Sequence, residues 1–122
     1  MSDTRVHFGD VPVLVCSAEG PTLGKEADAL DIIGNASYNG EVRWVAVPAE
    51  RFDDAFFQLR TRLAGDIVQK FVQYGLGLAV VGDISRHTSQ SEALRDFVRE
   101  CNRGRHTWFV TDLDDLRQRL AS

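Results

Sequence analysis

Apolar residues occur along this chain in two patterns. Short continuous runs predict strands, and apolar residues at three- and four-residue spacing predict helices. Short runs rich in β-branched and aromatic residues, bounded by Gly, Pro or Asp, are typical of strands. The predicted strands occupy residues 6–8, 11–16, 42–47, 76–81 and 106–110. Gly9-Asp10 predicts a tight turn between the first two, and Pro48 stops the third. The run at 76–81 is apolar throughout, which indicates a central strand covered on both faces.

Between these runs, apolar residues recur at three- and four-residue spacing, which predicts helices that each bury one stripe. The predicted helical segments are residues 25–37, a short turn at 53–57, a main helix at 62–74, a helix opening at residues 89–92, and a last helix capped by Asp112. In the first of them we expect Ala29, Leu30, Ile33 and Ala36 to face the core, and Asn39-Gly40 to end the helix. The 53–57 turn breaks near Arg60-Thr61 before the main helix begins.

Capping residues define the expected helix ends. The hydroxyl of Thr61 is available to accept an orphan N–H as N-cap of the 62–74 helix, and Gly75 closes that helix. Ser89-Gln90-Ser91-Glu92 fits a capping box, and Gly104 is placed to end the following helix in a left-handed conformation.

The resulting order is β-β-α-β-α-β-α-β-α, with about four helices. Because strands and helices alternate after the first hairpin, we expect right-handed crossovers onto a mixed, mostly parallel five-stranded sheet. The 122 residues are near the usual size of one domain, so we expect a single α/β domain over residues 1–122.

Composition and charge narrow the classes of function. The chain carries 14 basic and 18 acidic residues, and its basic residues are scattered, so we expect no nucleic-acid partner. Apolar runs are too short to cross a bilayer and the first residues lack an export signal, so we expect no membrane partner and a cytoplasmic location. Cys16 and Cys101 form no metal-ligand pattern, which favours buried structural thiols in a reducing compartment, with no metal and no cofactor.

Three segments carry residue types that could do chemistry. Gly20-Pro21-Thr22-Leu23-Gly24-Lys25 invites a phosphate-loop interpretation, but the glycine spacing and Glu26 do not fit, so we favour a simple turn. Asp83, Ser85 and His87 follow a strand end, where open α/β sheets hold ligands, although Asp83 and Ser85 also suit a turn.

The third segment surrounds the start of the main helix. Arg60, Thr61, Asp66 and Lys70 are the best candidate site, because an anion there meets free N–H groups, the positive end of a helix dipole and arginines. The alternative is an N-cap threonine flanked by solvated arginines. No catalytic residue is assigned.

The chain resembles a bacterial family known as domain of unknown function 4180 over nearly its full length. The segments that carry this resemblance are VLVCS at 13–17, FFQLRT at 56–61, AGDIVQKF at 64–71, AVVGDIS at 79–85 and LRDF at 94–97. The order of elements also resembles the STAS domains of bacterial anti-sigma-factor antagonists and sulfate transporters. The STAS resemblance implies a Ser or Thr before the second helix that is phosphorylated by a partner kinase and followed by Gly. Thr61 takes that place, while Arg62 stands where both families imply Gly.

Three hypotheses for function follow. The first is a non-enzymatic STAS-like interaction or regulatory module with a protein partner and a plausible homodimer. The second is a sensor that binds a small anion or nucleotide through Arg60, Thr61 and Asp83, near Ser85. The third is an enzyme that uses Asp83 and His87.

Overall fold

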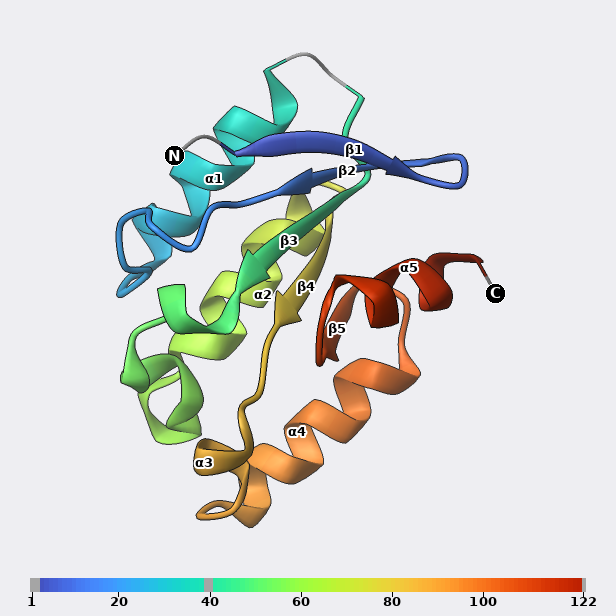
Figure 1. Ribbon diagram of the computed structural model, residues 1–122. Coiled ribbons are helices and arrows are strands. Elements are labelled where there is room, and N and C mark those ends of the chain that lie inside the picture. The colour runs from blue at the N-terminus through green and yellow to red at the C-terminus, as the bar shows by residue number, and fades with distance from the viewer. Residues whose placement is uncertain (1–2, 39–40, 122) are drawn as a thin grey trace.

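A five-stranded sheet organises the part of the chain that the structure describes, and Figure 1 shows its strands with the helices packed around them. The computed structural model describes residues 3–38 and 41–121, so the predicted helix end at Asn39-Gly40 lies outside the described residues. The strands are β1 (Thr4–Phe8), β2 (Val11–Val15), β3 (Trp44–Pro48), β4 (Gly77–Val81) and β5 (Thr107–Val110), in spatial order β1-β2-β3-β4-β5. β1 pairs antiparallel with β2, and the other pairs are parallel. The predicted fold class is therefore confirmed.

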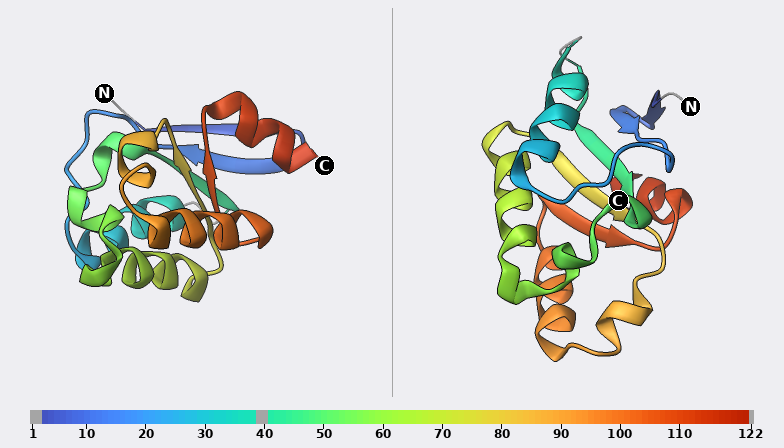
Figure 2. Two further views of the ribbon diagram at one scale, coloured as in Figure 1. Left: turned by 90° about the horizontal axis from the view of Figure 1, so that it is seen from below. Right: turned by 90° about the vertical axis from the view of Figure 1, so that its left-hand side faces the viewer.

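Helices cover the two faces of the sheet unequally. The described α-helices are α1 (Glu26–Ser37), α2 (Leu63–Gln73), α3 (Ser85–Thr88), α4 (Glu92–Arg103) and α5 (Leu113–Ala121). Three 3₁₀ helices precede α2, namely η1 (Ala49–Arg51), η2 (Asp54–Phe57) and η3 (Leu59–Thr61). Successive parallel strands lie side by side, so right-handed crossovers bring α1, α2 and α4 to one face, and α5 lies across the other (Figure 2).

Each face of the sheet has its own apolar core. The larger core fills the space beneath α1, α2 and α4, where Phe56, Phe71 and Leu78 are fully buried. The smaller core lies under α5, where Leu116 meets Trp44 and Val13. Burying a side chain of this kind contributes roughly 1.5–3 kcal/mol, so the two cores together fix the layer arrangement.

The buried face of α1 differs from the prediction at one position. Ala29, Ile33 and Ala36 are buried as expected, but Leu30 is 38% exposed and Ile32 takes its place in the core. Residues three and four apart share a helix face, and the set 29, 32, 33, 36 satisfies that spacing, whereas residue 30 lies about 100° away from residue 29. The expected burial of Leu30 is therefore wrong.

Three predicted caps are also corrected. Arg62, with φ 64°, is the N-cap residue of α2, and the Thr61 hydroxyl accepts only the Leu63 N–H at 3.3 Å. Ser91, rather than Ser89, caps α4 by accepting the Leu94 N–H at 3.1 Å. Gly104 ends α4 in an extended conformation, with φ −85° and ψ −167°.

Two further helix ends match the prediction. Asp112 accepts the Asp115 N–H at 2.8 Å, which caps α5. At the end of α2, Gly75 has φ 71° and its N–H bonds the Val72 carbonyl, while the Leu76 N–H bonds the Phe71 carbonyl. This pair of bonds is a Schellman motif, and the positive φ explains why glycine stands there.

The loop between β2 and α1 is built around Arg51, which is 6% exposed. The guanidinium donates to the Pro21 carbonyl through Nε (3.2 Å) and Nη2 (3.0 Å), and to the Ser17 carbonyl through Nη1 (3.1 Å). A loop that turns carbonyl oxygens toward a cation presents the opposite polarity to a phosphate loop, which presents N–H groups. The interpretation of residues 20–25 as a simple turn is therefore supported.

Candidate functional site

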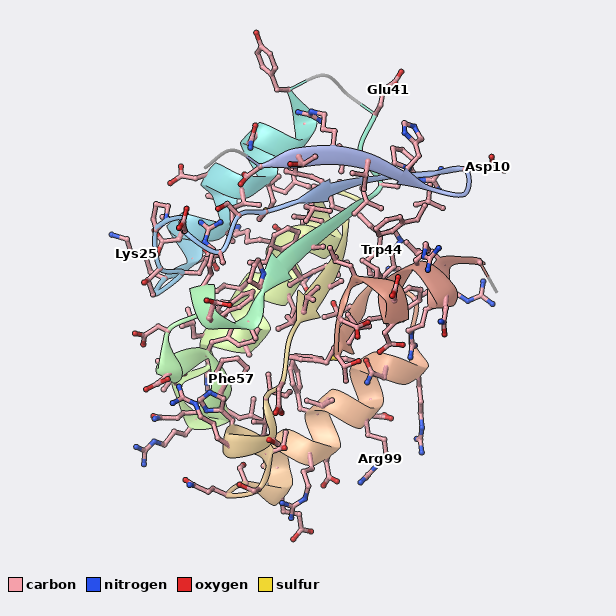
Figure 3. All side chains as sticks on the ribbon, in the orientation of Figure 1. Asp10, Lys25, Glu41, Trp44, Phe57 and Arg99 are labelled. Atoms are coloured by element: carbon pink, nitrogen blue, oxygen red, sulfur yellow. The ribbon has the colours of Figure 1, made fainter. Side chains whose placement is uncertain are left out.

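One hollow lies at the carboxyl ends of β3 and β4, and a second hollow adjoins it between the 3₁₀ turns before α2 and the start of α4. In this part of the molecule the 3₁₀ turns lie beside α3 (Figures 1 and 3). In open α/β sheets the carboxyl edge is where ligands commonly bind. One hollow, the acidic hollow, has a volume of about 300 Å³ and is lined by Glu50, Asp54, Phe57, Asp83, Arg86 and His87, among others. The other, the basic hollow, has a volume of about 440 Å³ and is lined by Phe57, Gln58, Arg60, His87, Gln90 and Ser91, among others.

Phe57 and His87 form the wall shared by both hollows. Their rings stack with centroids 4.1 Å apart and an interplanar angle of 10°. Phe57, labelled in Figure 3, is buried and also contacts Phe56 edge-on in the larger core. The wall is thus anchored to the core on the Phe57 side, which fixes the position of the His87 ring.

His87 is further held by a short polar chain. Arg86 Nε donates to His87 Nε2 at 3.2 Å, and Arg86 Nη2 forms an ion pair with Asp54 Oδ1 at 3.1 Å. Burial and the adjacent Arg86 guanidinium lower the pKa of His87, against a smaller opposing effect of Asp54. The imidazole is therefore neutral at pH 7, and its bond to Arg86 assigns the ring proton to Nδ1.

The Thr61 side chain links the two 3₁₀ turns, η2 and η3, that precede α2. Its hydroxyl proton is shared between the Ala55 carbonyl at 2.7 Å and the Gln58 carbonyl at 2.8 Å. The Thr61 N–H also bonds the Gln58 carbonyl, at 2.9 Å. These bonds join η2 to η3, so Thr61 positions the basic hollow without lining it.

The predicted site residues are dispersed. Arg60 lines the basic hollow and Asp83 the acidic hollow, on opposite sides of the aromatic wall. Lys70 Nζ lies 3.8 Å from Glu26 Oε1, in an ion pair that joins α2 to α1. Asp66 is exposed in the first turn of α2. Neither of those two residues lines either hollow, and a role for them stays a prediction.

Asp83 and Ser85 form the turn that their sequence favoured. The Ser85 N–H donates to Asp83 Oδ1 at 2.8 Å. This bond, together with one from the Ser85 side chain, lowers the pKa of Asp83, which is ionised at pH 7. The carboxylate thus adds negative charge to the acidic hollow.

Sequence reasoning did not identify Asp54, Phe57 and Arg86 as parts of this site. Asp54 and Phe57 belong to 3₁₀ turns without a regular apolar period, and they meet Arg86 and His87 across a separation of about thirty residues. The sequence did place Arg86 beside His87, shortly after the turn at Asp83, and this proximity could have indicated Arg86 as a site residue.

Clusters of possible metal ligands and cysteine thiols are the other reactive features to consider. Among residues 3–38 and 41–121, no group of three or more His, Cys, Asp or Glu side chains is placed to hold a metal ion. Burial raises the pKa of Cys16 to about 12 and that of Cys101 to about 11, so neither thiol is activated as a thiolate at pH 7. Within the same residues, no helix is both long and apolar enough to cross a membrane.

Comparisons with known proteins identify the family. No curated protein and no solved structure matches the chain. The family described as domain of unknown function DUF4180 matches residues 8–120, which is most of the chain and includes both hollows. The chain therefore belongs to the DUF4180 family.

Proposed function

We propose that this protein is a non-catalytic binding domain that holds a small ligand by an anionic group in the basic hollow. The observation that carries the proposal is the charge of that hollow. Arg60 lines it, no carboxylate does, and no ion pair joins Arg60 to another described residue. In a chain with a net charge of −4, an unpaired arginine at a hollow of about 440 Å³ favours an anion from solution.

The other side of the basic hollow reinforces this preference. Ser91 is the N-cap of α4 and Ala93 lies in its first turn, and the dipole of this 12-residue helix places partial positive charge at this end. Gln58 and Gln90 add amide groups that can donate hydrogen bonds. The ligand would therefore meet a guanidinium on one side and a helix N-terminus on the other.

The contacts of His87 and Asp83 support binding over acid–base catalysis. His87 Nε2 already accepts a hydrogen bond from Arg86, and Asp83 Oδ1 accepts one from Ser85. A general base needs an oxygen or nitrogen lone pair within reach of the substrate proton. Because the Arg86 N–H occupies the imidazole lone pair, His87 is not free to act as a general base in this geometry, and the third hypothesis gains no support from it.

Isothermal titration calorimetry with inorganic phosphate tests the proposal. We expect the wild type to bind phosphate, and Arg60→Gln to weaken binding about tenfold, because a charge-assisted contact is lost. Arg62→Gln is the matched control, because it removes the same charge from a nearby exposed residue that lines neither hollow. Equal weakening by both variants, or no binding by the wild type, would contradict the proposal.

A second candidate is the STAS-like regulatory module that works through a protein partner. One observation favours it. Arg60, Thr61 and Arg62 are consecutive exposed residues just before α2, and Arg62 adopts the left-handed conformation that glycine adopts without strain. A glycine could therefore replace Arg62 without strain at the place where the STAS resemblance implies glycine. Phosphorylation of Thr61 would first have to release its hydroxyl from the Ala55 and Gln58 carbonyls.

Native mass spectrometry of the protein from its own host, compared with Thr61→Ala, separates the two candidates. A protein partner bound to the wild type and absent from the variant supports the regulatory module, and a second copy of the chain would identify a homodimer. A retained small molecule in both supports ligand binding. A cytoplasmic location belongs to either proposal, because the free thiols of Cys16 and Cys101 suit a reducing compartment.

A further inference from the structure

The two hollows that share the Phe57–His87 wall carry opposite charge. The basic hollow has one arginine and no carboxylate, whereas three carboxylates and one arginine line the acidic hollow. With His87 neutral, the acidic hollow has a formal charge of three minus one, or two negative charges. Two adjoining recesses of opposite sign are suited to a molecule that is itself charged at both ends.

We propose that the ligand is dipolar, with an anionic group in the basic hollow and an ammonium group in the acidic hollow. This inference rests on the proposed function and adds a second requirement to it. The chemical class is an amine joined by a short linker to a phosphate or carboxylate, and the linker crosses the shared aromatic wall.

The carboxylates of the acidic hollow differ in how far they are already neutralised. Asp54 is paired with Arg86 at 3.1 Å. Neither Glu50 nor Asp83 forms an ion pair with another described residue, and neither is buried. An ammonium group would therefore bind between Glu50 and Asp83, and Asp54 would keep Arg86 in place.

The linker would cross the wall on the His87 side. Phe57 is buried, but His87 is only partly buried, so part of this residue is exposed beside the two hollows that it lines. Because Nε2 accepts from Arg86, Nδ1–H is the hydrogen-bond donor of this ring. A linker that crosses here passes over an aromatic edge, which favours short methylene chains over bulky groups.

A series of ω-aminoalkyl phosphates of increasing chain length tests the inference, with n-alkyl phosphates of the same lengths as amine-free references. We expect one chain length to bind about fivefold more tightly than its reference, because two accessible carboxylates each contribute a modest ion pair. Asp83→Asn and Glu50→Gln should each reduce that gain, and neither should weaken the binding of inorganic phosphate, because neither carboxylate lines the basic hollow. The amide oxygen introduced by Asp83→Asn can still accept the Ser85 N–H, so the turn is retained.

The outcomes distinguish the inference from the function on which it rests. If phosphate binds through Arg60 but the amine adds no affinity at any length, the dipolar inference fails and the anion site stands. A gain that survives in both carboxylate variants, or that is lost equally in the Asp66→Asn control on α2, also overturns the inference. If neither phosphate nor any aminoalkyl phosphate binds, the proposed function itself fails.

Discussion

Replacing Arg51 by lysine should destabilise the fold strongly, although the charge is kept. The guanidinium reaches the carbonyls of Ser17 and Pro21 through three nitrogens in a fixed fork. A lysine ammonium is a point donor on a flexible stem and can bond only one of these carbonyls well. The other carbonyl then loses a charge-assisted bond, and the substituted side chain stays buried.

The magnitude follows from the bonds that are lost. A hydrogen bond to a charged group contributes roughly 1.5–3 kcal/mol, so the loss of one or two gives a decrease in unfolding free energy of about 3 kcal/mol. With an unfolding entropy of about 2.1 cal/mol/K per residue, that corresponds to a fall in Tm of about 12 °C. Urea denaturation followed by circular dichroism measures the free energy, and the m-value should not change.

Two further variants make the Arg51 test specific. Arg60→Lys is the matched control, since Arg60 is exposed and donates no hydrogen bond within the described residues, and it should change stability by less than about 0.5 kcal/mol. Gly20→Ala should destabilise as Arg51→Lys does, because its Cβ would overlap the Arg51 guanidinium, and the two changes together should be less than additive. An Arg51→Lys stability within about 0.5 kcal/mol of wild type would refute the reasoning.

Three other predictions concern the candidate site, and each can be checked by urea denaturation. Arg62→Gly should raise the unfolding free energy by about 0.5–1 kcal/mol. The backbone strain of a non-glycine residue in the left-handed conformation is removed, and this gain exceeds the loss that comes from a more flexible unfolded chain. A decrease in stability would contradict this prediction. Thr61→Val should lower the unfolding free energy by about 1 kcal/mol, and Thr61→Ser should leave it unchanged, because the hydroxyl joins η2 to η3. Equal effects of the two variants would show that the hydroxyl hydrogen bonds contribute nothing to stability. The pKa of His87 lies below its ordinary value of 6.5 in the folded protein, so the unfolded chain binds the proton first and stability falls as pH drops below about 6.5. His87→Gln should reduce that fall between about pH 7.5 and 5.5, and an unchanged profile would be inconsistent with a neutral imidazole held in the wall.

The strands were predictable because their signals are local. Each is a short apolar run, and the flanking Gly9, Pro48, Gly75 and Gly82 mark turns or ends that backbone geometry requires. Those three glycines have positive φ, which explains their presence at strand ends. The mostly parallel character of the sheet followed from the alternation of strands and helices. The spatial order β1-β2-β3-β4-β5 comes from the structure.

Helix faces and caps were less predictable because the sequence admits two solutions. The first helix has apolar residues at 29, 30, 32, 33 and 36, so a stripe could be drawn through Leu30 or through Ile32. In the structure the face formed by 29, 32, 33 and 36 packs into the core, and Leu30 lies outside it. Ser89 and Ser91 are both capable N-caps, and the short helix α3 occupies Ser85–Thr88 and so leaves Ser91 to begin α4.

The candidate site was only half predictable. Arg60, Asp83 and His87 were recognisable by residue type and by their places after strand or turn signals. The stacking of Phe57 on His87, and the charge difference between the two hollows, depend on how η2 packs against α3, which no periodic pattern encodes. The sequence therefore grouped Arg60 with Asp83, and the structure separates them.

The most direct test of the anion site is to locate bound phosphate by ¹H–¹⁵N NMR titration of the full chain. We predict that the amide signals of the residues around the basic hollow shift together and saturate, and that signals on β1 and α1 stay in place; the residues to follow are Gln58, Arg60, Gln90, Ser91 and Ala93. Shifts that spread without saturation, or that gather instead around Arg43, Arg105 and His106 at the amino-terminal edge of the sheet, would contradict the proposed site.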